Sequence, residues 1–239
     1  MSPQLILAGI IGFIVCAYGN VVNDIQDIEI DKVNNPKRPL PSGQVDIKNV
    51  KVFAILFFII SILFSVIFGV LPFLLVFGAL ILLFFYATHF KRTIWSNFIV
   101  ALITGLSFIL GGLVAKNSLC ILPFLFSFFI HLSREIIKDV IDIKGDKSMG
   151  IISLPIVSGV EQSFNISALS LAILCIILPL PFVLKVLNLV YILILLIFAY
   201  PMLIYIMFKL LKRPHKGELK RLSNMLKISM VIGLVAMIL

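Results

Sequence analysis

The sequence predicts an all-α protein, a polytopic bundle of about eight transmembrane helices. Of its 239 residues, 61% are hydrophobic, and the mean hydropathy is +1.18, above the range of soluble globular domains. Apolar runs of about 18 or more residues, enough to cross a bilayer, recur along the whole chain. Charged residues collect at the ends of these runs. We therefore expect one transmembrane domain over residues 1–239.

The apolar runs place the helices in chain order. The first run, from Leu5 to Val22, follows Ser2 and Pro3 without a basic segment, so we interpret it as a mature membrane helix and not as a signal peptide. Short turns are expected near 69–72, 116–118 and 181–185, and longer loops near 32–50 and 144–163. The predicted helices are 4–31, 50–70, 72–90, 95–115, 119–143, 164–184, 187–211 and 222–239.

The basic residues predict the orientation. If the chain crosses the membrane at each helix, 18 of its 20 basic residues fall on one side, and only Lys116 and Lys185 fall on the other. By the positive-inside rule the rich side is cytoplasmic. We expect a multi-pass protein of the cell membrane with its active site facing the cytoplasm. The net charge of +9 is then explained by topology and site chemistry, and no nucleic-acid partner is expected.

One spacing of polar side chains occurs twice, with gaps of four, three and four residues. These gaps place all members of a set on one face of a helix. Two facing rows of carboxylates repel each other unless cations lie between them. A solvated helix end is the plain alternative, but ionisable groups near membrane depth are costly and usually functional. The first ladder is Asn20, Asp24, Asp27 and Asp31, and the second ladder is Glu135, Asp139, Asp142 and Asp146.

The two ladders predict a magnesium–diphosphate site. Mg²⁺ prefers oxygen ligands and typically combines a few carboxylates with phosphate oxygens of the substrate. Asn20 and Asn23 are candidate neutral ligands or donors to the diphosphate. A salt-bridged surface helix explains the second ladder poorly, because like charges four residues apart destabilise a helix. The predicted ligands are Asp24, Asp27, Asp31, Glu135, Asp139, Asp142 and Asp146, and the six aspartates are also the predicted catalytic residues.

Basic side chains near the ladders are candidate phosphate contacts. Three prolines stiffen the loop at 32–43 and fix the direction of Lys37 and Arg38, which we expect to clamp phosphate oxygens. An ordinary positively charged flank is the alternative for both residues. The same two alternatives apply to a helix-to-helix corner whose residues could reach the diphosphate, namely Tyr86, Lys91, Arg92 and Asn97. The other predicted substrate contacts are Tyr86, Lys91, Arg92, Arg134 and Lys138.

These motifs resemble those of a known family. Asn23-Asp24-x-x-Asp27-x-x-x-Asp31, with the Asn-x-Pro-x-Arg-Pro-x-Pro-Ser-Gly stretch after it, is similar to the signature of UbiA-type intramembrane prenyltransferases. The second ladder resembles their second aspartate motif, and Tyr86-x4-Lys91 resembles a further feature. The resemblance implies a helical fold in which two Mg²⁺ ions hold a prenyl diphosphate below a cytoplasmic cap, with its tail in a tunnel open to lipid.

Within that family, residues 29–43 and 134–147 are most similar to enzymes that form the second ether bond of archaeal lipids. This implies transfer of a geranylgeranyl group from its diphosphate to the glycerol hydroxyl of geranylgeranylglyceryl phosphate. The expected partners are thus a prenyl diphosphate, a lipid-phosphate acceptor and membrane lipid. An aromatic acceptor of quinone synthesis remains the alternative, and a cation transporter is a distant one. Members usually have nine helices, whereas eight are predicted here, with the first ladder on the first helix.

Overall fold

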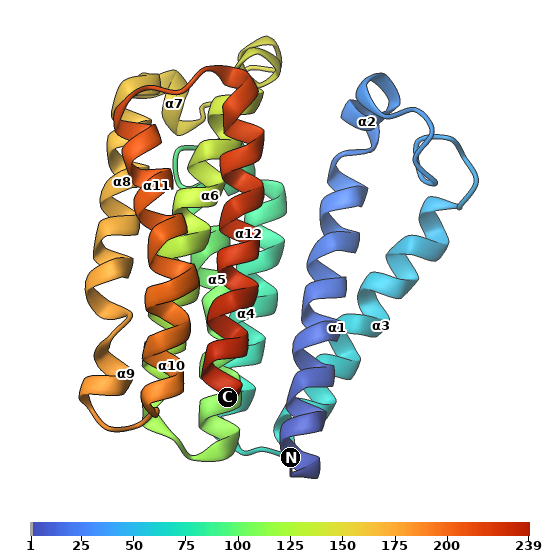
Figure 1. Cartoon of the computed structure of the whole chain (residues 1–239). Helices are drawn as coiled ribbons and strands as arrows, with labels where there is room; N and C mark the ends of the chain where they lie inside the picture. The colour runs from blue at the N-terminus through green and yellow to red at the C-terminus, as the bar shows by residue number, and fades with distance from the viewer. Residues whose placement is uncertain (1) are drawn as a thin grey trace. The chain divides into compact units, whose positions relative to one another are not determined.

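The structure is a computed structural model that describes residues 2–239, apart from the side chains of Val33 and Asn34. Within that part the secondary structure is helical throughout, and no strand occurs (Figure 1). The helices are α1 (Pro3–Gln26), α2 (Ile28–Asn34), α3 (Ile47–Val66), α4 (Val70–Thr88), η1 (Phe90–Arg92), α5 (Ser96–Ala115), η2 (Ser118–Cys120), α6 (Ile121–Ser148), α7 (Leu154–Val157), α8 (Val160–Ile177), α9 (Leu180–Val183), α10 (Leu189–Ile194), the π-helical η3 (Leu195–Ala199), α11 (Tyr200–Leu211) and α12 (Lys216–Ile238).

Eight helical stretches of the described chain are long and apolar enough to cross a membrane. They confirm the predicted polytopic helical bundle. Their bounds are Pro3–Gln26, Ile47–Val66, Val70–Thr88, Ser96–Ala115, Ser118–Ser148, Val160–Val183, Leu189–Leu211 and Lys216–Ile238.

The helices form two compact units. Unit 1 comprises Met1–Lys91 and Leu106–Cys120, and unit 2 comprises Arg92–Gly105 and Ile121–Leu239. Helix α5 contributes its first half to unit 2 and its second half to unit 1. Each ladder therefore lies in its own unit. The single domain over residues 1–239 stays a prediction.

Unit 1 is built on α1, which packs against both α3 and α4. The buried apolar side chains include Ile11 of α1 and Leu80 of α4, both fully buried. Gly19 allows α1 to approach α4 closely, because a Cβ atom at this position would lie 2.7 Å from Leu83 Cδ2. This packing fixes the end of α1 that carries the first ladder.

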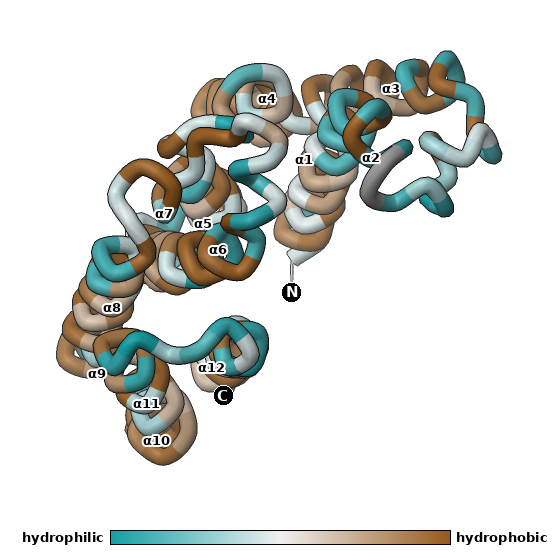
Figure 2. The backbone as a smooth tube through the Cα atoms, turned by 90° about the horizontal axis from the view of Figure 1, so that it is seen from above, coloured by the Kyte–Doolittle hydropathy of each residue, from teal (hydrophilic) through white to brown (hydrophobic). Residues whose placement is uncertain are grey.

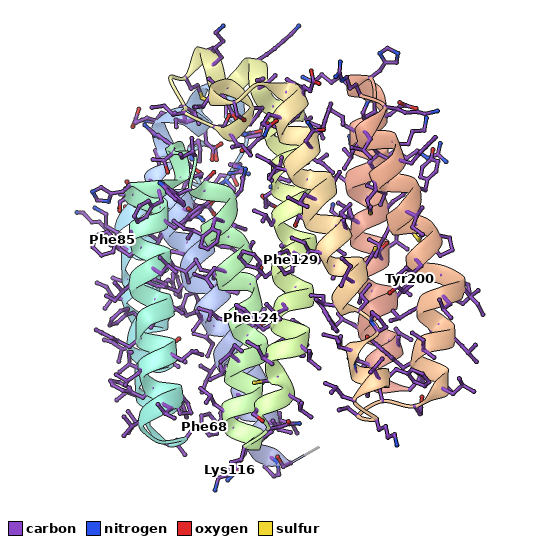
Figure 3. The ribbon with its side chains drawn as sticks, turned by 90° about the vertical axis from the view of Figure 1, so that its left-hand side faces the viewer. Phe68, Phe85, Lys116, Phe124, Phe129 and Tyr200 are labelled. Carbon is purple, nitrogen blue, oxygen red and sulfur yellow. The ribbon has the colours of Figure 1, made fainter. Side chains whose placement is uncertain are left out.

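Unit 2 has the larger core. Helix α6 packs against α8 and α12, and α11 packs against α8. The hydroxyl groups of Ser133 on α6 and Ser167 on α8 are hydrogen-bonded at 2.7 Å inside this core. Tyr200 at the start of α11 donates to the Cys175 carbonyl at 2.7 Å, and it is labelled with Phe129 of α6 among the apolar side chains of Figure 3. Interhelical hydrogen bonds of this kind fix helix positions inside a membrane.

The predicted first helix, 4–31, is wrong in one respect that matters for the site. It is two helices, because α1 ends at Gln26 and α2 begins at Ile28. Asp27 between them has φ −91° and ψ −1°, although its N–H still donates to the Asn23 carbonyl. The apolar residues that hold α1 against its neighbours end here, so the charged segment beyond Asp27 turns separately. The first ladder thus runs across a helix junction, whereas the second lies entirely within α6.

Other helix bounds also differ from the prediction. Helix α6 continues to Ser148, one turn beyond the expected end at 143. The stretch predicted at 164–184 begins at Val160, and it is interrupted before Pro179, where the short α9 follows. Helix α12 begins at Lys216, not at 222, because the polar turn there already buries Leu219 against the core. Polarity, on which the sequence bounds depended, marks the end of an apolar run and not the end of a helix.

Candidate active site: two acidic ladders

In the first ladder, one guanidinium serves two carboxylates. Arg38 Nη1 donates to Asp31 Oδ2 at 2.6 Å and lies 3.6 Å from Asp24 Oδ1. The Asp31 side chain is only 9% exposed, and it also accepts a hydrogen bond from Asn35 Nδ2 at 3.0 Å. Asp24 is more than half exposed. The loop after α2 therefore turns back and places a cation on the row of acids that precedes it.

The sequence of this loop explains the turn. Pro36, Pro39 and Pro41 restrict its backbone. Two backbone hydrogen bonds fold it at Arg38, whose N–H donates to the Asn35 carbonyl at 3.0 Å and whose carbonyl accepts from Ser42 N–H at 3.0 Å. The stiffened turn holds the Arg38 side chain beside the ladder. The predicted role of the prolines is consistent with this geometry.

A second cation reaches the first ladder from η1, the short helix that follows α4. Lys91 Nζ is hydrogen-bonded to Asp27 Oδ2, and both side chains are largely buried. Asn23 Oδ1 lies nearby in sequence on α1, buried and without a hydrogen-bond partner among the described residues. Asn20 Nδ2 donates to Cys16 Sγ at 4.0 Å. The junction around Asp27 thus holds one paired carboxylate and one buried carbonyl oxygen that is not hydrogen-bonded.

A cavity of about 410 Å³ lies beside the first ladder within unit 1. Asp24, Asp31 and Arg38 line its polar side, whereas Leu40 of the loop and Phe57 of α3 are among the side chains on its apolar side. A cavity with convergent charged groups and an apolar wall has the chemistry of a site for an amphiphilic molecule.

In the second ladder, Glu135 is neutralised by its own helix. Arg134 Nη1 lies 2.6 Å from Glu135 Oε1, and Lys138 Nζ lies 2.7 Å from Oε2. The Glu135 side chain is only 12% exposed. Both oxygens of Glu135 are thus paired with cations, so the geometry favours Glu135 as an anchor for Arg134 and Lys138. Its role as a metal ligand stays a prediction.

The next member, Asp139, has a neutral partner from another helix. Asn97 Nδ2 near the start of α5 donates to Asp139 Oδ2 at 2.9 Å. Asn97 itself is 5% exposed, and its Oδ1 accepts from Ser96 Oγ at 3.4 Å. The sequence indicated Asn97 as one of four residues at a helix corner that could reach the diphosphate. It did not indicate Asn97 as the partner of Asp139, because a hydrogen bond across 42 residues leaves no periodic signal. Asp142 is exposed and Asp146 is half-buried on the last turns of α6.

The other predicted substrate contacts are Lys37, Arg92 and Tyr86, and their roles stay predictions. Lys37 and Arg92 are exposed, and Tyr86 is half-buried at the end of α4. The Arg92 carbonyl accepts a hydrogen bond from Ile152 N–H at 3.0 Å, which ties the segment before α5 to the segment after α6 within unit 2.

The donor chemistry fits a hard cation. Carboxylates and the Asn23 carbonyl oxygen are the ligand types that Mg²⁺ prefers. Among the described residues, no three metal-ligating side chains come together, and basic side chains hold Asp27 and Asp31. Mg²⁺ usually takes only one or two protein carboxylates and completes its shell with water and phosphate oxygens. The residues present therefore fit the ion together with a phosphate ligand.

Comparison with known proteins decides the family. The family model described as the UbiA prenyltransferase family matches residues 1–231. The chain belongs to the UbiA prenyltransferase family. It is therefore a prenyltransferase and a multi-pass membrane protein, as the resemblance predicted.

Relatives within the UbiA family are similar over nearly the whole chain. A digeranylgeranylglyceryl phosphate synthase of Methanocaldococcus jannaschii is 39% identical over 228 residues, which is 95% of this chain and 80% of the relative. One of Methanococcus aeolicus is 40% identical over 240 residues, which is 96% of this chain and 84% of the relative.

Solved structures of UbiA proteins share the fold. One that concerns digeranylgeranylglyceryl phosphate synthase in membranes has a TM-score of 0.87 and 37% identity, over 98% of this chain and 84% of that one. A UbiA homolog from Archaeoglobus fulgidus, bound to DMAPP and Mg²⁺, has a TM-score of 0.68 and 19% identity, over 98% of this chain and 88% of that one. The second likeness shows the fold alone.

Proposed function

We propose that this prenyltransferase moves a geranylgeranyl group from geranylgeranyl diphosphate to the free glycerol hydroxyl of geranylgeranylglyceryl phosphate. The observation that carries the proposal is the similarity, over nearly the full chain, to enzymes named digeranylgeranylglyceryl phosphate synthase. The cavity beside the first ladder supports it, because charged groups and an apolar wall meet there as the two parts of a prenyl diphosphate do.

The reaction replaces one C–O bond by another. The allylic C1–O bond of the donor breaks, and its electron pair leaves with the diphosphate. The acceptor hydroxyl oxygen then bonds to C1, and its proton leaves with the diphosphate. The difficult step is charge separation, so groups that stabilise charge growing on the diphosphate contribute most to the rate.

Arg38 and Lys91 are the proposed phosphate contacts of the first ladder. Each lies on an aspartate in the free protein, and each is positioned to exchange that carboxylate for a phosphate oxygen. Arg38 presents a planar fork that suits two oxygens at once, whereas Lys91 is a compact point charge. In the second ladder, Arg134 and Lys138 remain on Glu135 and keep the local charge balanced.

Aspartates of both ladders are the proposed ligands of magnesium, with Asp24, Asp27 and Asp31 in unit 1 and Asp139, Asp142 and Asp146 in unit 2. Mg²⁺, when bound, supplies the charge neutralisation that makes diphosphate a good leaving group. Asn20 and Asn23 are the proposed neutral contacts, and the buried oxygen of Asn23 supports its inclusion. Two ions are proposed, and the active site is proposed to face the cytoplasm of the cell membrane.

The test is a product assay with the purified full chain in lipid nanodiscs. Radiolabelled geranylgeranyl diphosphate, Mg²⁺ and either geranylgeranylglyceryl phosphate or an aromatic quinone precursor are supplied, and products are identified by mass spectrometry. We expect the doubly prenylated glyceryl phosphate only. Prenylation of the aromatic compound alone would refute the proposed acceptor.

Variants test the ladders in the same assay. Asp24→Ala and Asp139→Ala should each lower turnover at saturating Mg²⁺ at least a hundredfold, by the scale of a lost charge-stabilising group. The matched control is Glu29→Ala, which removes an exposed acid of α2 that pairs with Lys32 at 2.7 Å. Turnover of either aspartate variant equal to that of the control would contradict the assignment.

A further inference from the structure

The exposed face of α12 carries a row of polar side chains. Lys216, Lys220, Asn224 and Lys227 follow one another at gaps of four, four and three residues, so they share one face of the helix. All four are exposed. The face toward the unit 2 core is instead apolar and begins with Leu219. We name the four residues the α12 stripe.

The positive charge of the α12 stripe is uncompensated. Glu218 of α12 accepts from Lys209 Nζ at 2.9 Å, and Glu161 of α8 is paired with Arg213. The aspartates of α6, which packs against α12, also belong to unit 2. In the described part of the chain no ion pair involves a lysine of the stripe. Figure 2 shows hydrophilic residues along the connection between α11 and α12, directly before the stripe. The stripe therefore has positive charge available for an anion.

The position of Lys227 along α12 distinguishes it from the basic residues at the start of the helix. Lys227 is the twelfth of the 23 residues of α12, about 16 Å along the axis from Lys216 at 1.5 Å per residue. Flanking charges lie at the ends of membrane helices, whereas ionisable groups within a span are costly and mark binding or transport paths. Helix α12 is also the least apolar of the eight candidate spans.

Beyond Lys227 the same face becomes apolar. Val231 and Leu234 continue the row and are 59% and 46% exposed. The face therefore changes along the helix from cationic to hydrocarbon-like. This order matches a molecule with an anionic head and a long apolar tail.

We infer that the α12 stripe binds the phosphate head of the lipid-phosphate acceptor, with Lys220 and Lys227 as the principal contacts and Val231 and Leu234 beneath its isoprenoid chain. This inference rests on the proposed function, which names the acceptor. It adds a binding site for the acceptor phosphate outside the two ladders. An ammonium group holds a phosphate monoester without a metal ion, so the acceptor head is bound independently of Mg²⁺. A bulk anionic membrane lipid has the same head chemistry, and the experiment separates the two.

The experiment measures binding, so it does not depend on turnover. The full chain is placed in nanodiscs of a zwitterionic lipid with EDTA, and binding of radiolabelled geranylgeranylglyceryl phosphate is compared with that of the neutral alcohol lacking the phosphate. The test variant is Lys220→Gln/Lys227→Gln. The matched control is Arg221→Gln, which removes one exposed charge of the same helix away from the stripe. Lys220→Arg/Lys227→Arg retains the charge.

The expected result is specific to the phosphate. The double Gln variant should bind the acceptor roughly ten- to a hundredfold more weakly, on the scale of a charge-assisted hydrogen bond, while the Arg variant and the control bind it as the parent does. Binding of the neutral alcohol should be the same in all four proteins. The assay remains informative if no product forms, in which case the proposed function fails and the stripe assignment stands.

Four results would overturn the inference. Equal acceptor binding by the parent and the double Gln variant would show that the stripe makes no contact. Competition by added phosphatidylglycerol at equal concentration would assign the stripe to bulk lipid. An equal loss of binding in the Arg221→Gln control would show that the effect comes from net charge. A lowered unfolding temperature in both the double Gln variant and the Arg variant would show that it comes from stability.

Discussion

Replacing Asn97 by alanine tests the proposed magnesium site through a residue that carries no charge. Asn97 Nδ2 donates to Asp139 Oδ2 at 2.9 Å, and Asn97 is 5% exposed. Without this donor, one orientation of the Asp139 carboxylate is no longer favoured over others. A hydrogen bond to a charged group contributes roughly 1.5 to 3 kcal/mol, which corresponds to about a ten- to a hundredfold change in a binding constant. Loss of a residue that orients a metal ligand typically has an effect of the same size.

The assay is turnover as a function of Mg²⁺ concentration. We expect the Asn97→Ala variant to need about ten to a hundred times more Mg²⁺ for half-maximal activity, with a maximal rate close to that of the parent. Ser96→Ala is the matched control, because Ser96 contacts Asn97 at a longer 3.4 Å and does not touch Asp139. Its Mg²⁺ requirement should change by less than about threefold.

One result would refute the reasoning. If Asn97→Ala lowers the maximal rate at every Mg²⁺ concentration and leaves the half-maximal concentration unchanged, Asn97 does not act through a metal ligand. An equally reduced unfolding temperature in both variants would instead show that the pair only supports the packing of α5.

Two further predictions concern packing and orientation. Gly112→Ala should destabilise the protein by about 1 to 3 kcal/mol, because the added Cβ would lie 2.2 Å from Cys120 Cβ. The control is Gly111→Ala, whose added Cβ would have no atom within 4 Å and should not destabilise the protein. Equal unfolding temperatures for the two variants would contradict this packing. In intact cells, a cysteine introduced at Lys37 should resist an impermeant thiol reagent and one introduced at Lys185 should react, by the positive-inside rule; the opposite pattern would invert the proposed topology.

The sequence predicted the features that depend on composition and local periodicity. The eight apolar spans and the one-face arrangement of the second ladder on α6 follow from residue spacing alone. The break at Asp27 does not, because its i to i+4 spacing continues through a junction where only the backbone angles change. The pairing of Lys91 with Asp27 joins residues 64 apart. Such contacts depend on which helix ends lie together, and no local pattern records that.

The two ladders share a spacing but differ in how their charge is balanced. In the first, Arg38 comes from a loop and Lys91 from the short helix η1, so neither cation belongs to the helices that carry the acids. In the second, Arg134 and Lys138 belong to α6 and hold the buried Glu135. That arrangement leaves Asp139 with a neutral amide and Asp142 exposed. The geometry therefore favours Arg38 and Lys91 of the first ladder over Arg134 and Lys138 of the second as the phosphate-binding cations.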